Sequence, residues 1–346
     1  MTKDEHYMSR CLELAKKSQG HTAPNPMVGS VIVHEGKIIG EGRHQKYGKP
    51  HAEVNAVNSV QDKSLLANSV LYVNLEPCAH VGKTPACSVM IIEHKIPKVV
   101  IGCSDSYKEV DGKGIQMLRD AGTEVVVGVL EEESRVLNAR FFTFHEKKRP
   151  YIILKWAQTS DGFIDFERTP DTPIGPNWIS DKYAQIKVHK WRAQEDAILV
   201  GTNTAEKDNP KLNVRLWKGK NPLRVLMDRQ LRLRTNLSLL DKSIETIVFT
   251  EKKSSKVPGL EFIFVDKNQG VFDVMMKTLY EREIQSLIIE GGAQLLRSVI
   301  ERGLWDEARV FVGDALFLSG IKAPKINKQP EFIERRPQNS LYYYKK

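Results

Sequence analysis

Several features that mark whole classes of protein are scarce or missing in this sequence. Four cysteines in 346 residues are too few for a disulfide framework, which favours a reducing compartment. No segment approaches the roughly 18 consecutive apolar residues of a membrane span. The first six residues are polar and mixed in charge, without the apolar core of a signal peptide. We therefore expect a cytoplasmic chain that does not enter a membrane.

Against these absences, one pattern of metal-ligating side chains stands out. His51 and Glu53 are followed by Pro77-Cys78 and then by Cys87. One imidazole and two thiolates leave the fourth tetrahedral position of Zn²⁺ open for water, whose pKa the metal lowers. Glu53 cannot easily share the metal with His51, but it can move protons at the bound water. This H-x-E…P-C order is that of the zinc-dependent nucleobase deaminases.

We therefore predict a catalytic zinc centre with His51, Cys78 and Cys87 as ligands and Glu53 as the general acid and base. The alternative is a structural zinc site, which would close with a fourth Cys or His at short spacing. The nearest spare side chains, His80 and Cys103, form no such pair with the others. Cys11 lies on the apolar stripe of an expected helix and is predicted to be a core residue.

The spacing between the two cysteines narrows the family further. The segments that carry the resemblance are 22–29, 42–44, 74–87 and 110–115. They resemble the deaminase half of the bifunctional riboflavin-biosynthesis deaminase/reductase. The resemblance implies hydrolysis of the 2-amino group of a diaminopyrimidinone that carries a ribosylamino-phosphate. It also implies that Asn25, His44 and Lys83 orient the pyrimidine or its phosphate.

Both halves of the chain alternate strands and helices, which indicates the α/β class. In the first half, expected strands are 28–33, 37–40, 70–75, 98–102 and 124–127, and expected helices are 4–18, 51–60, one from about 84, 113–121 and 130–139. In the second half, expected strands are 151–157, 197–201, 223–227, 246–250, 262–265, 286–290 and 308–312, and expected helices are 181–193, 271–282 and 292–302. The charged segment 145–150 is the expected linker. We assign a zinc deaminase domain to 1–146, built as an α/β/α sandwich, and a reductase domain to 147–346.

The second half has no G-x-G-x-x-G after a strand, so a Rossmann dinucleotide site is not supported. Instead, Gly291-Gly292 lies between an expected strand and an expected helix. Such a turn lets backbone N–H groups approach a phosphate at a helix N-terminus. A tight packing turn is the alternative explanation.

The second half also resembles the reductase half of the same bifunctional family. The segments that carry this resemblance are 151–157, 161–162, 178–180, 192–193, 197–204 and 208–215. The resemblance implies a dihydrofolate-reductase-like fold that uses NADPH to reduce a ribosyl group to ribityl. It implies cofactor contacts from Ala157, Trp178, Thr204, Asp208, Gly291, Gly292, Ala293 and Gln294. It implies substrate contacts from Lys155, Arg192, Leu212, Arg215 and Glu290.

The two arginines have a physical reason to contact the substrate, because a guanidinium binds phosphate bidentately. Taken singly, an arginine such as Arg192 is more often part of a solvated helix face, and one such as Arg215 is more often a loop charge. The reductase half departs from the family pattern at Pro176, where a serine is usual, and at Asn209, where an aspartate is usual. An inactive reductase-like binding domain therefore remains an alternative.

The formal net charge of +9 raises the question of nucleic acid. Basic residues are spread along the chain, and their densest clusters fall in 147–149, at the expected linker, and 345–346, in an expected tail. No interleaving of aromatic and basic residues accompanies the zinc motif. A small phosphorylated pyrimidine and a phosphorylated cofactor explain the charge as well, so we predict no nucleic-acid partner, with a nucleic-acid deaminase as the remaining alternative. We also predict a homo-oligomer.

Overall fold

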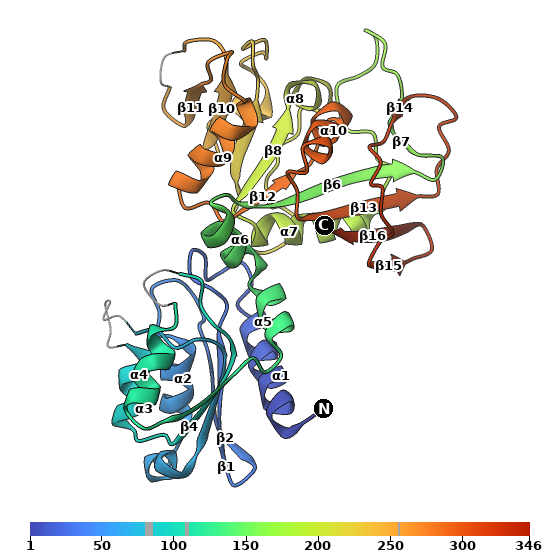
Figure 1. Cartoon of the computed structure of the whole chain (residues 1–346). Helices are drawn as coiled ribbons and strands as arrows, with labels where there is room; N and C mark the ends of the chain where they lie inside the picture. The colour runs from blue at the N-terminus through green and yellow to red at the C-terminus, as the bar shows by residue number, and fades with distance from the viewer. Residues whose placement is uncertain (80–85, 108–110, 255–256) are drawn as a thin grey trace. The chain divides into compact units, whose positions relative to one another are not determined.

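The computed structural model describes residues 1–346 except 80–85, 108–110 and 255–256. The chain divides into two compact units, Met1–Lys148 and Arg149–Lys346, each with its own sheet (Figure 1). Among the described helices, none combines the length and the apolar character that a membrane span requires. The mixed α/β class predicted from the sequence is confirmed.

The first unit is built on a five-stranded sheet with the order β2-β1-β3-β4-β5. Its strands are β1 Gly29–His34, β2 Lys37–Arg43, β3 Val70–Leu75, β4 Lys98–Cys103 and β5 Glu124–Val127. Its helices are α1 Lys3–Lys16, α2 Ala52–Ser59, α3 Cys87–Glu93, α4 Lys113–Asp120, α5 Glu131–Leu137 and α6 Ala139–Lys147, with a short 3₁₀ turn η1 at Lys63–Asn68. β1 is antiparallel to both of its neighbours, and β3, β4 and β5 run parallel.

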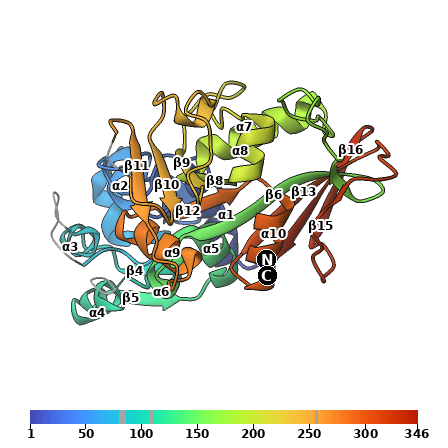
Figure 2. The same ribbon diagram turned by 90° about the horizontal axis from the view of Figure 1, so that it is seen from above.

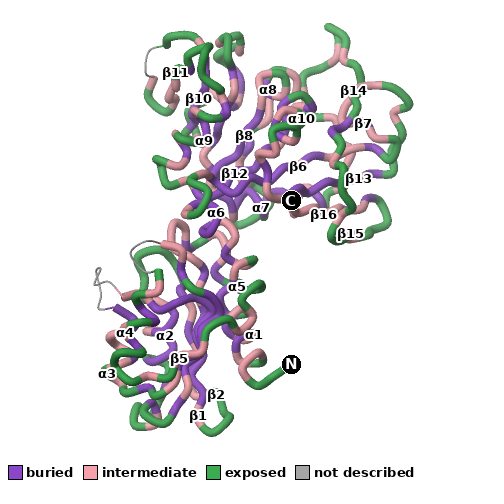
Figure 3. The backbone as a smooth tube through the Cα atoms, viewed as in Figure 1, coloured by how far each residue is buried: buried purple, intermediate pink, exposed green. Residues whose placement is uncertain are grey.

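Both faces of this sheet are buried, because side chains alternate along each strand. Ile32 of β1 belongs to the cluster that includes Ala56 of α2 and Ile91 of α3. Its neighbour Val31 belongs to the cluster on the other face, with Met8 and Cys11 of α1. Figure 3 shows the buried residues running along the strands. The result is the predicted α/β/α sandwich, with Cys11 in the core.

The second unit is built on a nine-stranded sheet with the order β11-β10-β9-β8-β12-β6-β13-β16-β15. Its strands are β6 Tyr151–Thr159, β8 Ala197–Gly201, β9 Leu223–Met227, β10 Thr246–Thr250, β11 Leu260–Phe264, β12 Ser286–Ile289, β13 Glu307–Gly313, β15 Phe332–Arg335 and β16 Asn339–Lys345. In this spatial order, the first seven strands, from β11 through β13, run parallel to one another. At the other edge, β16 is antiparallel to β13, and β15 is antiparallel to β16. Two short strands, β7 Phe163–Asp165 and β14 Ile321–Lys322, pair separately.

The helices of this unit are α7 Lys182–Gln194, α8 Thr202–Asp208, α9 Val271–Glu281 and α10 Ala293–Glu301, with a 3₁₀ turn η2 at Ser238–Leu240. The main core contains Met275 of α9 and Leu296 of α10, packed on alternate strand residues such as Leu154 of β6. Trp191 of α7 packs on Phe311 of β13 with ring centroids 5.6 Å apart and the rings tilted by 31°, and Phe311 is not part of that core. In Figure 2, α7 accordingly lies across the sheet from α9 and α10.

Two segments expected to be a linker and a tail are ordered secondary structure. Residues 145–147 form the last turn of α6, whose Phe141 and Phe142 pack against the ends of β3 and β4. The expected helix 130–139 ends instead at Leu137, where the Asn138 side chain leaves the helix to bond both the N–H and the C=O of Met27. The C-terminal residues form the internal strand β16. The lysines at the end of the chain led to the expectation of a tail, although the tyrosines before them are typical of a strand.

Candidate functional site

Three sequence elements bring the predicted zinc ligands together. His51 is the N-cap residue of α2, Cys87 is the first residue of α3, and Cys78 follows β3. The two cysteine segments are joined directly, because the Cys87 N–H donates to Cys78 Sγ at 3.3 Å and Ser88 donates to the Cys78 carbonyl oxygen. Two of the ligands therefore lie at helix N-termini, where the helix dipole favours an anionic thiolate or hydroxide.

The geometry of these ligands fits zinc. His51 Nδ1 lies 3.6 Å from Cys78 Sγ and 3.4 Å from Cys87 Sγ, and the three donor atoms lie within 4.8 Å of one another. A tetrahedral Zn²⁺ with Zn–N of about 2.0 Å and Zn–S of about 2.3 Å would separate N and S by about 3.6 Å. The donor set is one imidazole and two thiols, which is a common zinc set with one position left open.

Glu53 is buried beside this cluster, with an exposed fraction of 3 %. It lies in the first turn of α2, two residues after the ligand His51. Burial raises the pKa of Glu53 to about 7. A carboxyl group with a pKa near neutrality can both take up and release a proton, which is what a general acid and base must do.

Two of the three predicted pyrimidine contacts adjoin the zinc ligands. Asn25 Nδ2 lies 3.2 Å from His44 Nε2, and His44 Nδ1 lies 3.1 Å from the Pro50 carbonyl oxygen. The rings of His44 and His51 meet edge to face, with centroids 5.5 Å apart. Burial lowers the pKa of His44, which keeps the ring neutral at pH 7. The third contact, Lys83, lies outside the described residues.

A buried carboxylate that the sequence analysis did not single out anchors the cysteine turn. Glu76 accepts hydrogen bonds from the backbone N–H groups of Asp105, Gly112, Gly114 and Ile115, at 2.9 to 3.2 Å. A Cβ atom on Gly114 would lie 2.0 Å from the Pro77 carbonyl oxygen, so only glycine permits this approach. The Gly112-x-Gly114 pattern was the available signal.

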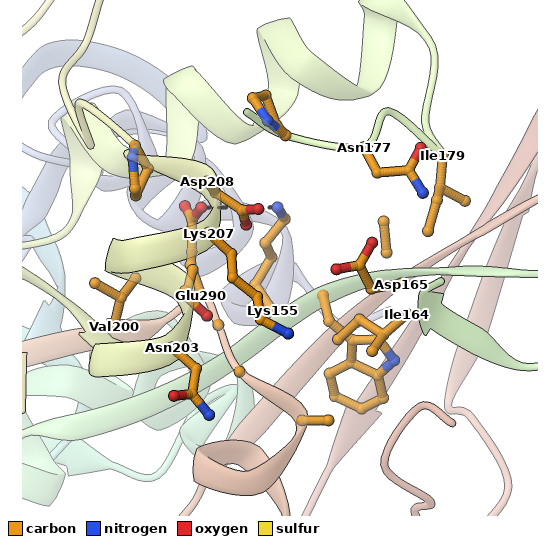
Figure 4. A pocket seen from close by; sticks show the side chains of 18 of the residues that line it. Lys155, Ile164, Asp165, Asn177, Ile179, Val200, Asn203, Lys207, Asp208 and Glu290 are labelled. Carbon is orange, nitrogen blue, oxygen red and sulfur yellow. Dashed lines mark ion pairs between the residues drawn. The ribbon is translucent and has the colours of Figure 1, made fainter. Parts of the chain in front are cut away.

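The second unit contains a cavity of about 610 Å³ beside the middle of β6 and the carboxyl ends of β8 and β12. Ligands bind at this edge in open α/β sheets. Figure 4 shows Lys155, Asp165, Asn177 and Glu290 around the cavity. The structure brings all of the predicted reductase residues to its lining: Lys155, Ala157, Trp178, Arg192, Thr204, Asp208, Leu212, Arg215, Glu290, Gly291, Gly292, Ala293 and Gln294.

A buried charge cluster forms one wall of this cavity. Arg192 donates to both oxygens of Glu290, at 2.9 Å from Nε and 2.6 Å from Nη2, and Lys155 Nζ lies 3.7 Å from the same carboxylate. Burial alone would raise the pKa of Glu290, but the charges of Arg192 and Lys155 lower it to about 2. Arg192 is therefore not on a solvated helix face. β6 continues to Thr159, so Lys155 lies inside the strand.

Arg215 is held by a residue that the sequence analysis missed. His189 of α7 is 2 % exposed, and its Nδ1 accepts the backbone N–H of Arg215 at 3.2 Å. Burial and the charges of Arg192 and Arg215 lower the pKa of His189 to about 4, so the ring stays neutral and can accept this bond. A helix histidine in an apolar stripe carries no sequence signal for this role.

The double-glycine turn is shaped for close approach of a ligand. Gly292 has φ of +78°, and Gly291 and Gly292 face Thr204 of α8. A Cβ on Gly291 would lie 2.9 Å from Thr204 Cγ2, so a side chain there would fill the space between them. Gly292 caps α10. A phosphate at this helix N-terminus would meet free N–H groups and the positive end of the helix dipole, so the turn fits a dinucleotide phosphate.

Comparison with known proteins agrees with both sites. Residues 1–103 match the family described as the cytidine and deoxycytidylate deaminase zinc-binding region, and residues 150–337 match the RibD C-terminal domain. The riboflavin biosynthesis protein RibD of Aquifex aeolicus is 41 % identical over 92 % of this chain and 89 % of its own. That of Escherichia coli is 34 % identical over 90 % of this chain and 88 % of its own.

Solved structures extend the likeness to the whole fold. A deaminase/reductase from Thermotoga maritima is 37 % identical and covers 99 % of this chain and 98 % of its own, with a TM-score of 0.87. RibD of Acinetobacter baumannii is 30 % identical at the same coverage, with a TM-score of 0.85. The predicted resemblance is confirmed, and the chain belongs to the RibD family of riboflavin-biosynthesis proteins, which join a zinc-dependent deaminase to an NADPH-dependent reductase.

Proposed function

We propose that the first unit hydrolyses the 2-amino group of 2,5-diamino-6-(5-phosphoribosylamino)pyrimidin-4-one. The observation that carries this proposal is the buried Glu53 beside the His51, Cys78 and Cys87 donor set. When bound, zinc supplies a Lewis acid that makes a coordinated water acidic. Zinc would be held by His51, Cys78 and Cys87. Glu53 would move one proton of the attacking water to the pyrimidine ring nitrogen and the other to the departing ammonia, while the water oxygen replaces the amino group at C2.

The side chains around the metal ligands orient the pyrimidine in this proposal. The neutral His44 bonds both the Asn25 side chain and the Pro50 carbonyl oxygen, so the imidazole and the amide are held in place before substrate binds. Lys83 would contact the ring or the phosphate. Pre-ordered donors and acceptors are an efficient means of orientation, because little conformational entropy is lost on binding.

We further propose that the second unit reduces the ribosyl group of the deaminated product to ribityl. NADPH supplies the hydride for this step. The Gly291-Gly292 turn and Thr204 bind cofactor phosphate, and Ala157, Trp178, Asp208, Ala293 and Gln294 complete the cofactor contacts. The cluster of Glu290 with Arg192 and Lys155 supports binding of the ribose.

The substrate phosphate is assigned to Arg215. Its Nη1 bonds the Asn213 side chain, and its backbone is fixed by His189. Both Nη2 and Nε of Arg192 are committed to Glu290, so Arg215 has the more available guanidinium of the two. Leu212, in the left-handed region at φ of +48°, directs this loop into the cavity wall.

We place the functional division between the deaminase at 1–146 and the reductase at 147–346. We also propose a cytoplasmic homo-oligomer that does not act on nucleic acid.

The test of both activities is to incubate the purified chain with the diaminopyrimidinone and to follow ammonia release and NADPH oxidation separately. Release of one ammonia before each NADPH is consumed supports the proposal. Ammonia without NADPH oxidation or NADPH binding would favour an inactive reductase. Ammonia released from tRNA but not from the pyrimidine would favour a nucleic-acid deaminase.

A further inference from the structure

A buried arginine in the lining of the reductase cavity is bonded on all three of its guanidinium nitrogens. Arg168 follows β7, and its side chain is only 7 % exposed. Its Nε donates to Asp165 Oδ2 at 2.8 Å, and its Nη2 donates to Asp208 Oδ1 at 2.7 Å. Its Nη1 donates to the carbonyl oxygens of Gly175 and Lys207, each at 2.9 Å. These four hydrogen-bond partners fix the position of the Arg168 guanidinium.

These partners come from three different parts of the cavity wall. Asp165 ends β7, Gly175 belongs to the segment 166–181 between β7 and α7, and Lys207 and Asp208 end α8. The Gly175 N–H also donates to the Lys207 carbonyl oxygen at 3.0 Å. The last carbonyl groups of a helix lack intrahelical partners and favour a nearby cation. Arg168 therefore fastens segment 166–181 to the end of α8.

Segment 166–181 and α8 carry residues assigned above to the cofactor. Trp178 lies on the segment and lines the cavity, although it is 57 % exposed. An indole so exposed is not held in place by burial, so its position depends on the backbone that carries it. Thr204 and Asp208 lie on α8. The guanidinium of Arg168 is therefore positioned to fix Trp178 and Asp208 relative to each other.

The charge of Arg168 also balances two carboxylates in the cavity wall, Asp165 and Asp208. Within the described part of the chain, Arg168 is the cation found at ion-pair distance from Asp165 and from Asp208. Without it, two carboxylates would face each other in the wall of a cavity meant for a ligand with several negative phosphates. Burial raises the pKa of Asp208, and Asp165 acts in the same direction, whereas the charge of Arg168 opposes both. Pairing these groups removes a repulsion that would weaken cofactor binding.

We propose that Arg168 is a positioning residue of the reductase, which holds segment 166–181 against α8 so that Trp178 and Asp208 bind NADPH. The proposal rests on the proposed function, because it takes these two residues as cofactor contacts. Arg168 acts through its neighbours rather than on the reacting atoms. Its loss should therefore change cofactor affinity far more than the rate of hydride transfer.

The test compares Arg168→Met with wild type in the full, zinc-loaded chain. NADPH affinity is measured by fluorescence titration, and kcat and KM for NADPH are measured with deaminated substrate. Both Kd and KM should rise about 10- to 100-fold, the scale of a misplaced binding group, while kcat stays within about threefold. Ammonia release should not change. The matched control is Arg282→Met, which breaks a pair with Glu261 that is about one-third exposed in the same unit, and which should leave Kd unaltered.

A second substitution tests the electrostatic part of the argument. Adding Asp165→Asn to Arg168→Met removes one of the two opposed carboxylates, so it should restore part of the lost NADPH affinity. Arg168→Lys keeps the charge but cannot reach four partners, and its Kd should fall between those of wild type and Arg168→Met. If Arg168→Met does not fold, the Arg168→Lys comparison decides the question.

Several results would overturn the inference. They are an unchanged Kd in a folded Arg168→Met variant, a Kd of Arg168→Lys equal to that of wild type, and a fall in kcat at constant Kd. An NADPH affinity that Asp165→Asn lowers further would also count against it. Failure of the wild-type chain to bind NADPH would refute the proposed function instead, so the two failures are distinguishable.

Discussion

Removing the charge of Glu290 tests the reductase cavity most directly, because this carboxylate balances two cations. Glu290→Gln keeps the shape of the side chain and leaves Arg192 and Lys155, whose side chains are 11 % and 17 % exposed, without their counter-charge. Removing one partner of a buried ion pair costs about 3–5 kcal/mol. Because this cluster borders a cavity, we expect the lower end of that range.

The pKa of Glu290 gives an independent magnitude. It is about 2 in the folded chain, against an unperturbed glutamate value of about 4.3. A difference of roughly two units, at 1.36 kcal/mol each, corresponds to about 3 kcal/mol of stability at neutral pH. The folded pKa is the lower one, so this contribution is complete above about pH 5 and is lost as the pH falls towards 2. The deficit of Glu290→Gln should therefore be full at pH 7 and shrink in acid.

The chain supplies its own probe for this measurement. All five tryptophans lie in the unit Arg149–Lys346, so selectively excited tryptophan fluorescence in a urea titration follows the unfolding of the reductase unit. The matched control is Glu261→Gln, which removes the same charge from a pair with Arg282 that is about one-third exposed. Such a pair contributes about 0–1 kcal/mol. NADPH oxidation should fall in Glu290→Gln, while ammonia release and zinc content stay at the wild-type level.

If Glu290→Gln unfolds at the same urea concentration as Glu261→Gln at pH 7, the charge of Glu290 does not stabilise the reductase unit. A stability deficit as large near pH 3 as at pH 7 would likewise show that the charge of Glu290 is not its source. Equal losses of NADPH oxidation and ammonia release would mean that the two sites are coupled.

Three further predictions concern the other assigned residues. Cys78→Ser should abolish zinc binding and deamination, and full zinc content by elemental analysis would show that the ligand assignment is wrong. Glu53→Gln should keep zinc but lower deamination at least ~10²-fold, the scale of general acid–base loss, in a stopped ammonia assay; undiminished turnover would move the proton transfer to another group. Arg215→Ala should weaken the reductase mainly in KM for its substrate, by ~2–5 kcal/mol if a desolvated phosphate loses its partner, and an unchanged KM would remove the phosphate from this arginine.

The zinc centre could be predicted from the sequence because its geometry is local. His51 and Glu53 lie at the start of one helix, and Cys78 and Cys87 are joined by direct contacts across a short segment. Tetrahedral coordination restricts the residue types so strongly that few other functions fit them. The strands at 70–75, 197–201, 223–227 and 246–250 were predicted with the bounds that the structure has, since buried strands form largely apolar runs. The bounds of the strand at 124–127 were also predicted, although its residues are only half-buried or exposed.

Other features depended on neighbours that are distant in the sequence. Helix α6 and strand β16 were missed because charged residues dominate their ends, while their aromatic side chains acquire meaning only against the sheet that buries them. Nothing in the sequence distinguishes Glu76 from other carboxylates, because its role depends on four backbone N–H groups that the fold brings to it from a distant loop and helix.

The reductase cavity shows the same division at the level of single charges. The family resemblance of the sequence predicted substrate contacts from Arg192 and Glu290, but only the fold shows that the two side chains form an ion pair, which joins α7 to the end of β12. Arg168 carried no sequence signal, because its partners lie in three segments that only the fold assembles. Residue type and local spacing determine which chemistry is possible. Which charges are buried, paired and aimed at a ligand is decided by tertiary structure, because the energy of a charge depends on what surrounds it.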